Sequence, residues 1–223
     1  MECNTFSSDL SIVSDSHGPF AAGPALKRRL LVHEAERWQG VSAQGGRHCG
    51  QVVSLFQGWN DRIERVAWCM AFVQYCLKQA DLLYDRLLQR SRSQGRHCVF
   101  ATQHVMTAWD HTPQQQRRRE PQPGFVAVWQ RYNADEPTQS GHAGIVVEVL
   151  NAQRFVTVEG NTRLACGDPS KRGVQRKRHR YPVNRGPLRL RGFLDPWMLQ
   201  EGGAQSPPSC VQSCSSWHPE EVS

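Results

Sequence analysis

The amino-acid sequence predicts an α+β fold in which N-terminal helices pack on an antiparallel β-sheet. In the first half of the chain, apolar residues recur at helical spacing. After Pro123 and Gly124, the pattern changes to short runs rich in β-branched and aromatic residues, which are typical of strands. A group of helices followed by a group of strands is the element order of an α+β domain.

Helices are expected over residues 25–38, 51–59, 68–88 and 101–109. The third has the strongest pattern, because its apolar residues fall on one face behind Cys69: these are Phe72, Val73, Cys76, Leu77 and Ala80. Cys69 should therefore lie in the first turn of a long helix.

Strands are expected over residues 125–129, 143–150, 154–158 and 188–194. Asn151 and Ala152 lie in the short connection between the second and third, which should form a hairpin. Residues 113–123 and 131–140 are rich in polar and turn-forming residues, and we interpret both segments as loops.

Composition indicates one folded domain. The chain has 223 residues, of which 39% are hydrophobic, enough for a core. We expect a flexible leader over residues 1–24, a catalytic domain over residues 25–199 and a flexible tail over residues 200–223.

The formal net charge of +7 favours polyanionic surroundings. No apolar run reaches the length of a membrane span and no Sec signal is recognisable, so we expect cytoplasmic synthesis with the eight cysteines as thiols.

Cys69 is the candidate nucleophile. A thiol in the first turn of a helix faces the positive end of the helix dipole and backbone N–H groups, which favour the thiolate and can bind an oxyanion. A cysteine in an apolar helix can also be a simple core residue, which is how we interpret Cys76. Cys69 therefore needs a base nearby.

His142 and Glu159 can supply that base and a group to orient it. His142 precedes the predicted strand 143–150, and Glu159 ends the run that begins at residue 154. In a hairpin, the start of the first strand lies beside the end of the second. An imidazole can take the thiol proton, and a carboxylate can hold the ring in the useful tautomer. Taken singly, His142 could be structural, Glu159 a surface carboxylate and Asn161 a turn residue.

Four segments in one order resemble the CHAP family of cysteine amidases and endopeptidases, relatives of NlpC-type enzymes. They are residues 68–73 with 75–77, 121–129, 141–147 and 158–162, and the resemblance covers roughly residues 30–199. The sequence departs from the family at Phe125, where an acidic residue commonly follows Pro-Gly, and in the long polar segment 131–140.

The resemblance implies a papain-like CHAP fold and a division of roles. Cys69 resembles the nucleophile, His142 the general base and later acid, Glu159 the group that orients His142, and Asn161 a further polar group beside the pair. The implied reaction cleaves an amide bond of peptidoglycan through a thioester, with no cofactor or metal. The bond is either that between N-acetylmuramic acid and L-alanine or one in the peptide stem or cross-bridge. Action at the cell wall would then follow lysis or specialised export.

Two other functions stay open. One is an amidase or transamidase acting on a small γ-glutamyl or polyamine conjugate, because one fold can host several substrates. The other is a basic module that binds wall or nucleic acid and retains a vestigial site.

Two further sequence features have competing interpretations. A basic run, defined as Lys171, Arg172, Arg176, Lys177, Arg178 and Arg180, can bind anionic envelope polymers, although we favour a solvated insertion between strands. Cys210, Cys214 and His218 have ligand-like spacing, and a histidine lies beside a cysteine at 48–49 and at 97–98. No CxxC pair accompanies them, so we do not predict a metal site. Trp38, Trp59, Trp109 and Trp129 could line a groove, but we expect most of them to pack in the core.

Overall fold

The computed structural model describes residues 22–43, 50–58, 67–89, 96–164, 171–181 and 185–197. The predicted tail, most of the predicted leader, Trp59, Cys49, Cys210, Cys214 and His218 lie outside these residues. Within them, no helix combines the length and the apolar character needed to cross a bilayer. The boundaries of the catalytic domain stay a prediction.

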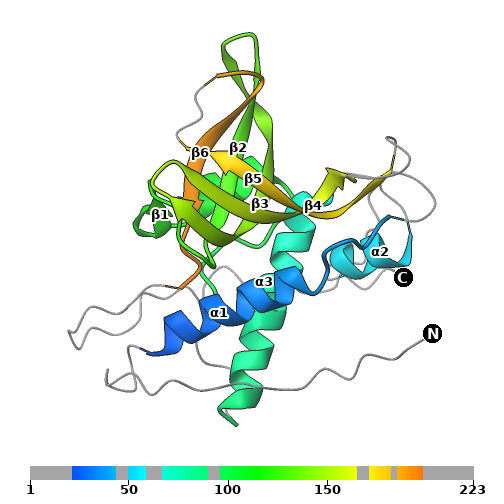
Figure 1. The fold of residues 1–223 in the computed structure, drawn as a ribbon, viewed down its shortest axis with the longest axis vertical. Helices are drawn as coiled ribbons and strands as arrows, with labels where there is room; N and C mark the ends of the chain where they lie inside the picture. The colour runs from blue at the N-terminus through cyan, green and yellow to red at the C-terminus, as the bar shows by residue number, and fades with distance from the viewer. Residues whose placement is uncertain are drawn as a thin grey trace, which may run out of the picture.

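The helices that the pattern predicts are all present in the described residues. They are α1 (Ala22–Glu36), α2 (Gln51–Gln57), α3 (Cys69–Leu87) and α4 (Val105–His111). α1 crosses α3 on one side of the sheet, and the N-terminal end of α3 meets the sheet (Figure 1). α4 begins four residues later than expected, at a point where the backbone of His104 donates a hydrogen bond to the Thr102 hydroxyl.

The strands form one antiparallel sheet in the described residues, in the order β1-β6-β2-β3-β4-β5. Their bounds are β1 (Arg117–Arg118), β2 (Val126–Asn133), β3 (Glu136–Asn151), β4 (Arg154–Arg163), β5 (Arg172–Arg180) and β6 (Leu188–Leu194). β3 and β4 pair as the expected hairpin, with Ile145 opposite Val158. The α+β prediction is confirmed.

Three segments differ from the prediction. Residues 131–140 form the outer end of the β2–β3 hairpin, with Asn133 opposite Glu136, because backbone pairing continues beyond the buried part of both strands. Residues 113–123 include a 3₁₀-helix (Gln114–Gln116) and β1, which pairs with β6. The basic run lies mainly in β5, where its backbone pairs with β4 along an edge of the sheet; it is not an insertion.

Apolar side chains cover both faces of the central strands. Along β2, Val126 and Val128 enter the core between sheet and helices. Ala127 and Trp129 enter a second cluster with Phe155 on the opposite face. Because alternate residues of a strand point to opposite faces, burial on both faces produces the continuous apolar run seen in the sequence. Trp109 and Trp129 are buried, as expected for core residues.

Candidate active site

The first turn of α3 is positioned by packing. The residue before the helix, Trp68, supplies no side-chain cap to the backbone N–H groups that follow. Its indole is fully buried and stacks on Phe56, with ring centroids 5.7 Å apart. Cys69 is therefore the first helical residue, at the end where N–H groups lack intrahelical acceptors.

Two glycines let the strands and α3 approach closely. A Cβ at Gly144 would lie 2.6 Å from Cγ of Glu159, so a larger residue there would displace the carboxylate. A Cβ at Gly160 would lie 2.6 Å from Cβ of Phe72 and would push β4 away from α3. These contacts hold the start of α3 against the ends of β3 and β4.

Cys69, His142 and Glu159 form a hydrogen-bonded row across these elements. His142 Nε2 lies 2.8 Å from Glu159 Oε2. The same ring is hydrogen-bonded to the side chain of Cys69. Because Nε2 faces the carboxylate, Nδ1 is the nitrogen left for the thiol. Cys69 is 2% exposed and Glu159 is 3% exposed, so the row is largely shielded from water.

The pKa shifts of Cys69 and His142 favour an ion pair between the two side chains. Burial raises the pKa of Cys69, but the hydrogen bond and charge of His142, with the backbone N–H groups of Ala143 and Met70, bring that pKa below its ordinary value. Burial lowers the pKa of His142, whereas hydrogen bonds to Cys69 and Glu159 and the charges of both raise it to about 10. Both shifts favour the ion pair of a thiolate and an imidazolium over the neutral pair.

Glu159 is the anionic end of this row. Burial raises the pKa of its carboxyl group, but hydrogen bonds and charges from His142 and His179 bring the pKa far below the ordinary range. The Thr157 hydroxyl also donates to Oε1, at 2.6 Å. The carboxylate therefore stays charged and can stabilise a protonated His142.

His179 was missed by sequence reasoning. Its Nε2 lies 2.6 Å from Glu159 Oε1, so two imidazoles contact one carboxylate. In the sequence this histidine belongs to a charged segment with no catalytic pattern. Pairing of β4 with β5 would have pointed to it, because Phe155 lies opposite His179 and Glu159 lies opposite Gln175. All four of these residues face the same side of the sheet.

Asn161 makes no hydrogen bond to this row through its side-chain oxygen. It adopts a left-handed backbone conformation, with φ of 55°, where the pairing of β4 with β5 is irregular. Its Oδ1 is buried and has no hydrogen-bond partner among the described residues. The structure thus joins Cys69, His142 and Glu159 by hydrogen bonds and leaves this fourth candidate with a free acceptor.

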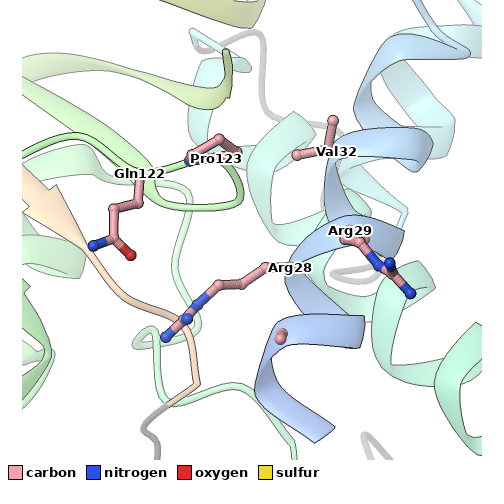
Figure 2. Close-up of a pocket in the computed structure, with 6 residues that line it drawn as sticks. Arg28, Arg29, Val32, Gln122 and Pro123 are labelled. Carbon is pink, nitrogen blue, oxygen red and sulfur yellow. The ribbon is translucent and has the colours of Figure 1, made fainter. Parts of the chain in front are cut away.

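A surface hollow of about 370 Å³ lies between α1 and the turn before β2 and contains none of these groups. Its lining residues are Ala25, Arg28, Arg29, Val32, Gln122 and Pro123. Arg28 and Arg29 leave α1 in different directions (Figure 2). Arg28 is already paired with Asp195, at 2.7 Å, and the lining supplies no nucleophile. We do not assign chemistry to this hollow.

No cluster of three histidine, cysteine, aspartate or glutamate side chains suited to a metal ion occurs in the described part of the chain. The two imidazole nitrogens near Glu159 face different carboxylate oxygens and do not converge on one point. The candidate ligands at 210, 214 and 218 lie outside the described residues.

Comparison with known proteins agrees with the resemblance. Residues 61–161 match the family model described as CHAP domain. The match spans Cys69, His142, Glu159 and Asn161 and omits His179. No curated protein and no solved structure matches the chain. The CHAP family comprises peptidoglycan amidases and endopeptidases, and the helices and antiparallel sheet agree with its papain-like fold. Residues 61–161 of this chain therefore match the CHAP domain family.

Proposed function

We propose that this protein is a cysteine-dependent peptidoglycan hydrolase that cleaves an amide bond of the cell wall through a thioester. The observation that supports this most directly is the row from the first turn of α3 to β4, in which Cys69 is hydrogen-bonded to His142 and His142 lies 2.8 Å from Glu159. A nucleophile, a base and a group that orients the base are the parts that acyl transfer requires.

In the first half of the proposed reaction, Cys69 Sγ attacks the amide carbonyl carbon and the carbonyl oxygen becomes an oxyanion. Backbone N–H groups at the start of α3 are suited to stabilise that oxyanion, because helix geometry leaves them without intrahelical acceptors. The C–N bond then breaks. His142 gives its Nδ1 proton to the departing amine, leaving a thioester on Cys69.

In the second half, water replaces the amine. Neutral His142 takes a proton from the water as its oxygen attacks the thioester carbonyl carbon. The C–S bond breaks, the carboxylic acid product leaves, and Cys69 returns as a thiolate beside protonated His142. Glu159 keeps the ring oriented in both halves and offsets its positive charge.

Asn161 has a less direct part in the proposal. Its buried Oδ1 is a free acceptor, which suits a donor on the substrate or on a rearranged His142 ring. The assignment of this residue to the site rests on the family resemblance.

We further propose that the basic run helps to hold the protein on anionic envelope polymers, with Arg176, Arg178 and Arg180 as its exposed members on β5. Arg176 contributes less charge, because it is paired with Glu36 at 2.9 Å and also with Glu148. Wall binding should weaken as salt is added. Binding at low salt that is unchanged in an Arg178→Ser/Arg180→Ser double variant would contradict this part of the proposal.

The decisive experiment is mass spectrometry of muropeptides after digestion of purified sacculi, with Cys69→Ala as the control. New N-terminal alanine and free muramic carboxyl groups would identify an N-acetylmuramoyl-L-alanine amidase. Cuts within the stem or the cross-bridge would identify an endopeptidase. If the wild-type protein releases no fragments but hydrolyses small γ-glutamyl conjugates, the peptidoglycan assignment is wrong and the alternative amidase function replaces it. Digestion that persists in Cys69→Ala would exclude the cysteine mechanism.

A further inference from the structure

We propose that His179 is a positioning residue of this site, which holds Glu159 so that the other carboxylate oxygen meets His142. This inference deepens the proposed cysteine chemistry and rests on it. The family match ends at residue 161, before this histidine. His179 comes instead from β5, at the edge of the sheet.

The two oxygens of Glu159 have different partners. Oε2 is 2.8 Å from His142 Nε2. Oε1 accepts from the Thr157 hydroxyl at 2.6 Å and lies 2.6 Å from His179 Nε2. In the described part of the chain, the only ion-pair partners of this carboxylate are the two histidines. No lysine or arginine there performs the anchoring role.

His179 is itself held by aromatic rings. Its imidazole lies 4.7 Å from the Trp129 ring and 5.3 Å from the Phe155 ring, centroid to centroid. Its Nε2 is also 3.0 Å from the Thr157 hydroxyl oxygen. Trp129 contacts the His142 ring as well, at 5.8 Å. One indole therefore packs against both imidazoles, so their separation is set by a buried side chain.

The effect on chemistry follows from this geometry. A hydrogen bond to a charged group contributes more than one between neutral groups. Without His179, Oε1 keeps only the Thr157 donor, and the carboxylate can rotate away from His142. A less well held carboxylate stabilises the imidazolium less, so a smaller fraction of Cys69 is thiolate at a given pH.

The titratable groups of the row come from four elements. They are Cys69 on α3, His142 on β3, Glu159 on β4 and His179 on β5. The ionisation of Cys69 is the best reporter of the row, because alkylation by iodoacetamide measures its thiolate fraction. This readout needs no peptidoglycan.

The test uses the full chain and two substitutions of different chemistry. His179→Phe keeps a ring between Trp129 and Phe155 but removes the donor, whereas His179→Gln retains an N–H donor at the position of Nε2. His33→Ala is the matched control, because His33 is an exposed histidine on α1. Alkylation of Cys69 is followed by peptide mass spectrometry across the acidic and neutral pH range, with thermal melting as the check on folding.

We expect the half-point of Cys69 alkylation in His179→Phe to move upward by about one pH unit, the equivalent of a hydrogen bond to a charged group. The kcat for soluble muropeptides should fall about tenfold with KM unchanged, because in this proposal His179 acts through Glu159. His179→Gln should retain most of the wild-type profile. If His179→Phe does not fold, His179→Ala takes its place with the same expected direction.

A folded Phe or Ala variant with the wild-type alkylation profile would overturn the proposal. An equal shift in His179→Gln would also overturn it, because the donor would then be irrelevant. Failure of the proposed function has a different signature. In that case the wild-type protein leaves muropeptides intact, while the alkylation profiles still report whether His179 positions Glu159.

Discussion

Cys69 and Cys76 lie on the same helix, about two turns apart. Both are buried, but their pKa values are shifted in opposite directions. The first is 2% exposed and the second is fully buried. The pKa of Cys69 is lowered in spite of burial, because His142 and two backbone N–H groups contact its sulfur. Burial and the nearby Glu34 carboxylate raise the pKa of Cys76 well above its ordinary value. The local partners, and not burial alone, therefore set the opposite pKa directions of the two thiols.

The difference arises from what each turn of α3 packs against. The first turn meets β3 and β4, where strand ends supply polar groups. The later turn lies in the core near α1, whose Glu34 is fully buried and accepts a hydrogen bond from Trp38. An anion there opposes a second negative charge, so Cys76 stays a neutral thiol.

The largest contrast between the two cysteines is expected in catalysis. Cys69→Ala should reduce fragment release from sacculi by on the order of 10⁴-fold or more, because the proposed thioester forms on the Cys69 sulfur. Cys76→Ala should digest sacculi at the wild-type rate. A folded Cys76→Ala variant as inactive as Cys69→Ala would remove the distinction that the structure draws.

Loss of the carboxylate should have the next largest effect. Glu159→Gln is expected to reduce kcat by about 10²- to 10⁴-fold, because an amide cannot stabilise the imidazolium as a carboxylate does and can turn an N–H donor toward a ring that also donates. Turnover of soluble muropeptides measures this effect. A wild-type kcat in the folded variant would mean that His142 is oriented by another group.

The pH dependence of alkylation compares the two thiols in one sample. Cys69 should react with iodoacetamide at neutral pH at least about tenfold faster than Cys76, because the pKa of Cys69 is lowered and that of Cys76 is raised. Hydrolysis should decline as pH rises through about 10, where His142 loses the proton that the leaving amine needs. Equal and slow labelling of both cysteines at neutral pH would contradict the thiolate at Cys69.

The smallest effect concerns stability. Cys76→Ala should lower the free energy of unfolding by about 1 kcal/mol, because a small cavity replaces the buried sulfur. Urea denaturation followed by tryptophan fluorescence measures the change. A much larger loss would indicate that Cys76 makes a specific contact beyond packing.

Local patterns were sufficient for much of the fold. Helical spacing behind Cys69 predicted α3, and the short turn at Asn151 predicted the pairing that brings His142 beside Glu159. The basic run was not recognised as a strand because seven of the residues in 171–180 are charged or histidine. Its strand conformation comes from backbone pairing with β4, and basic side chains are well suited to a sheet edge.

The sequence by itself therefore determined a cysteine at a helix start and a histidine and a glutamate at adjoining strand ends, because each depends on residues near it in the chain. Only the tertiary structure decided that Cys69 meets His142 and that His179 contacts Glu159. Those contacts join α3, β3, β4 and β5. Their approach depends on the packing of whole elements, including the space left by Gly144 and Gly160.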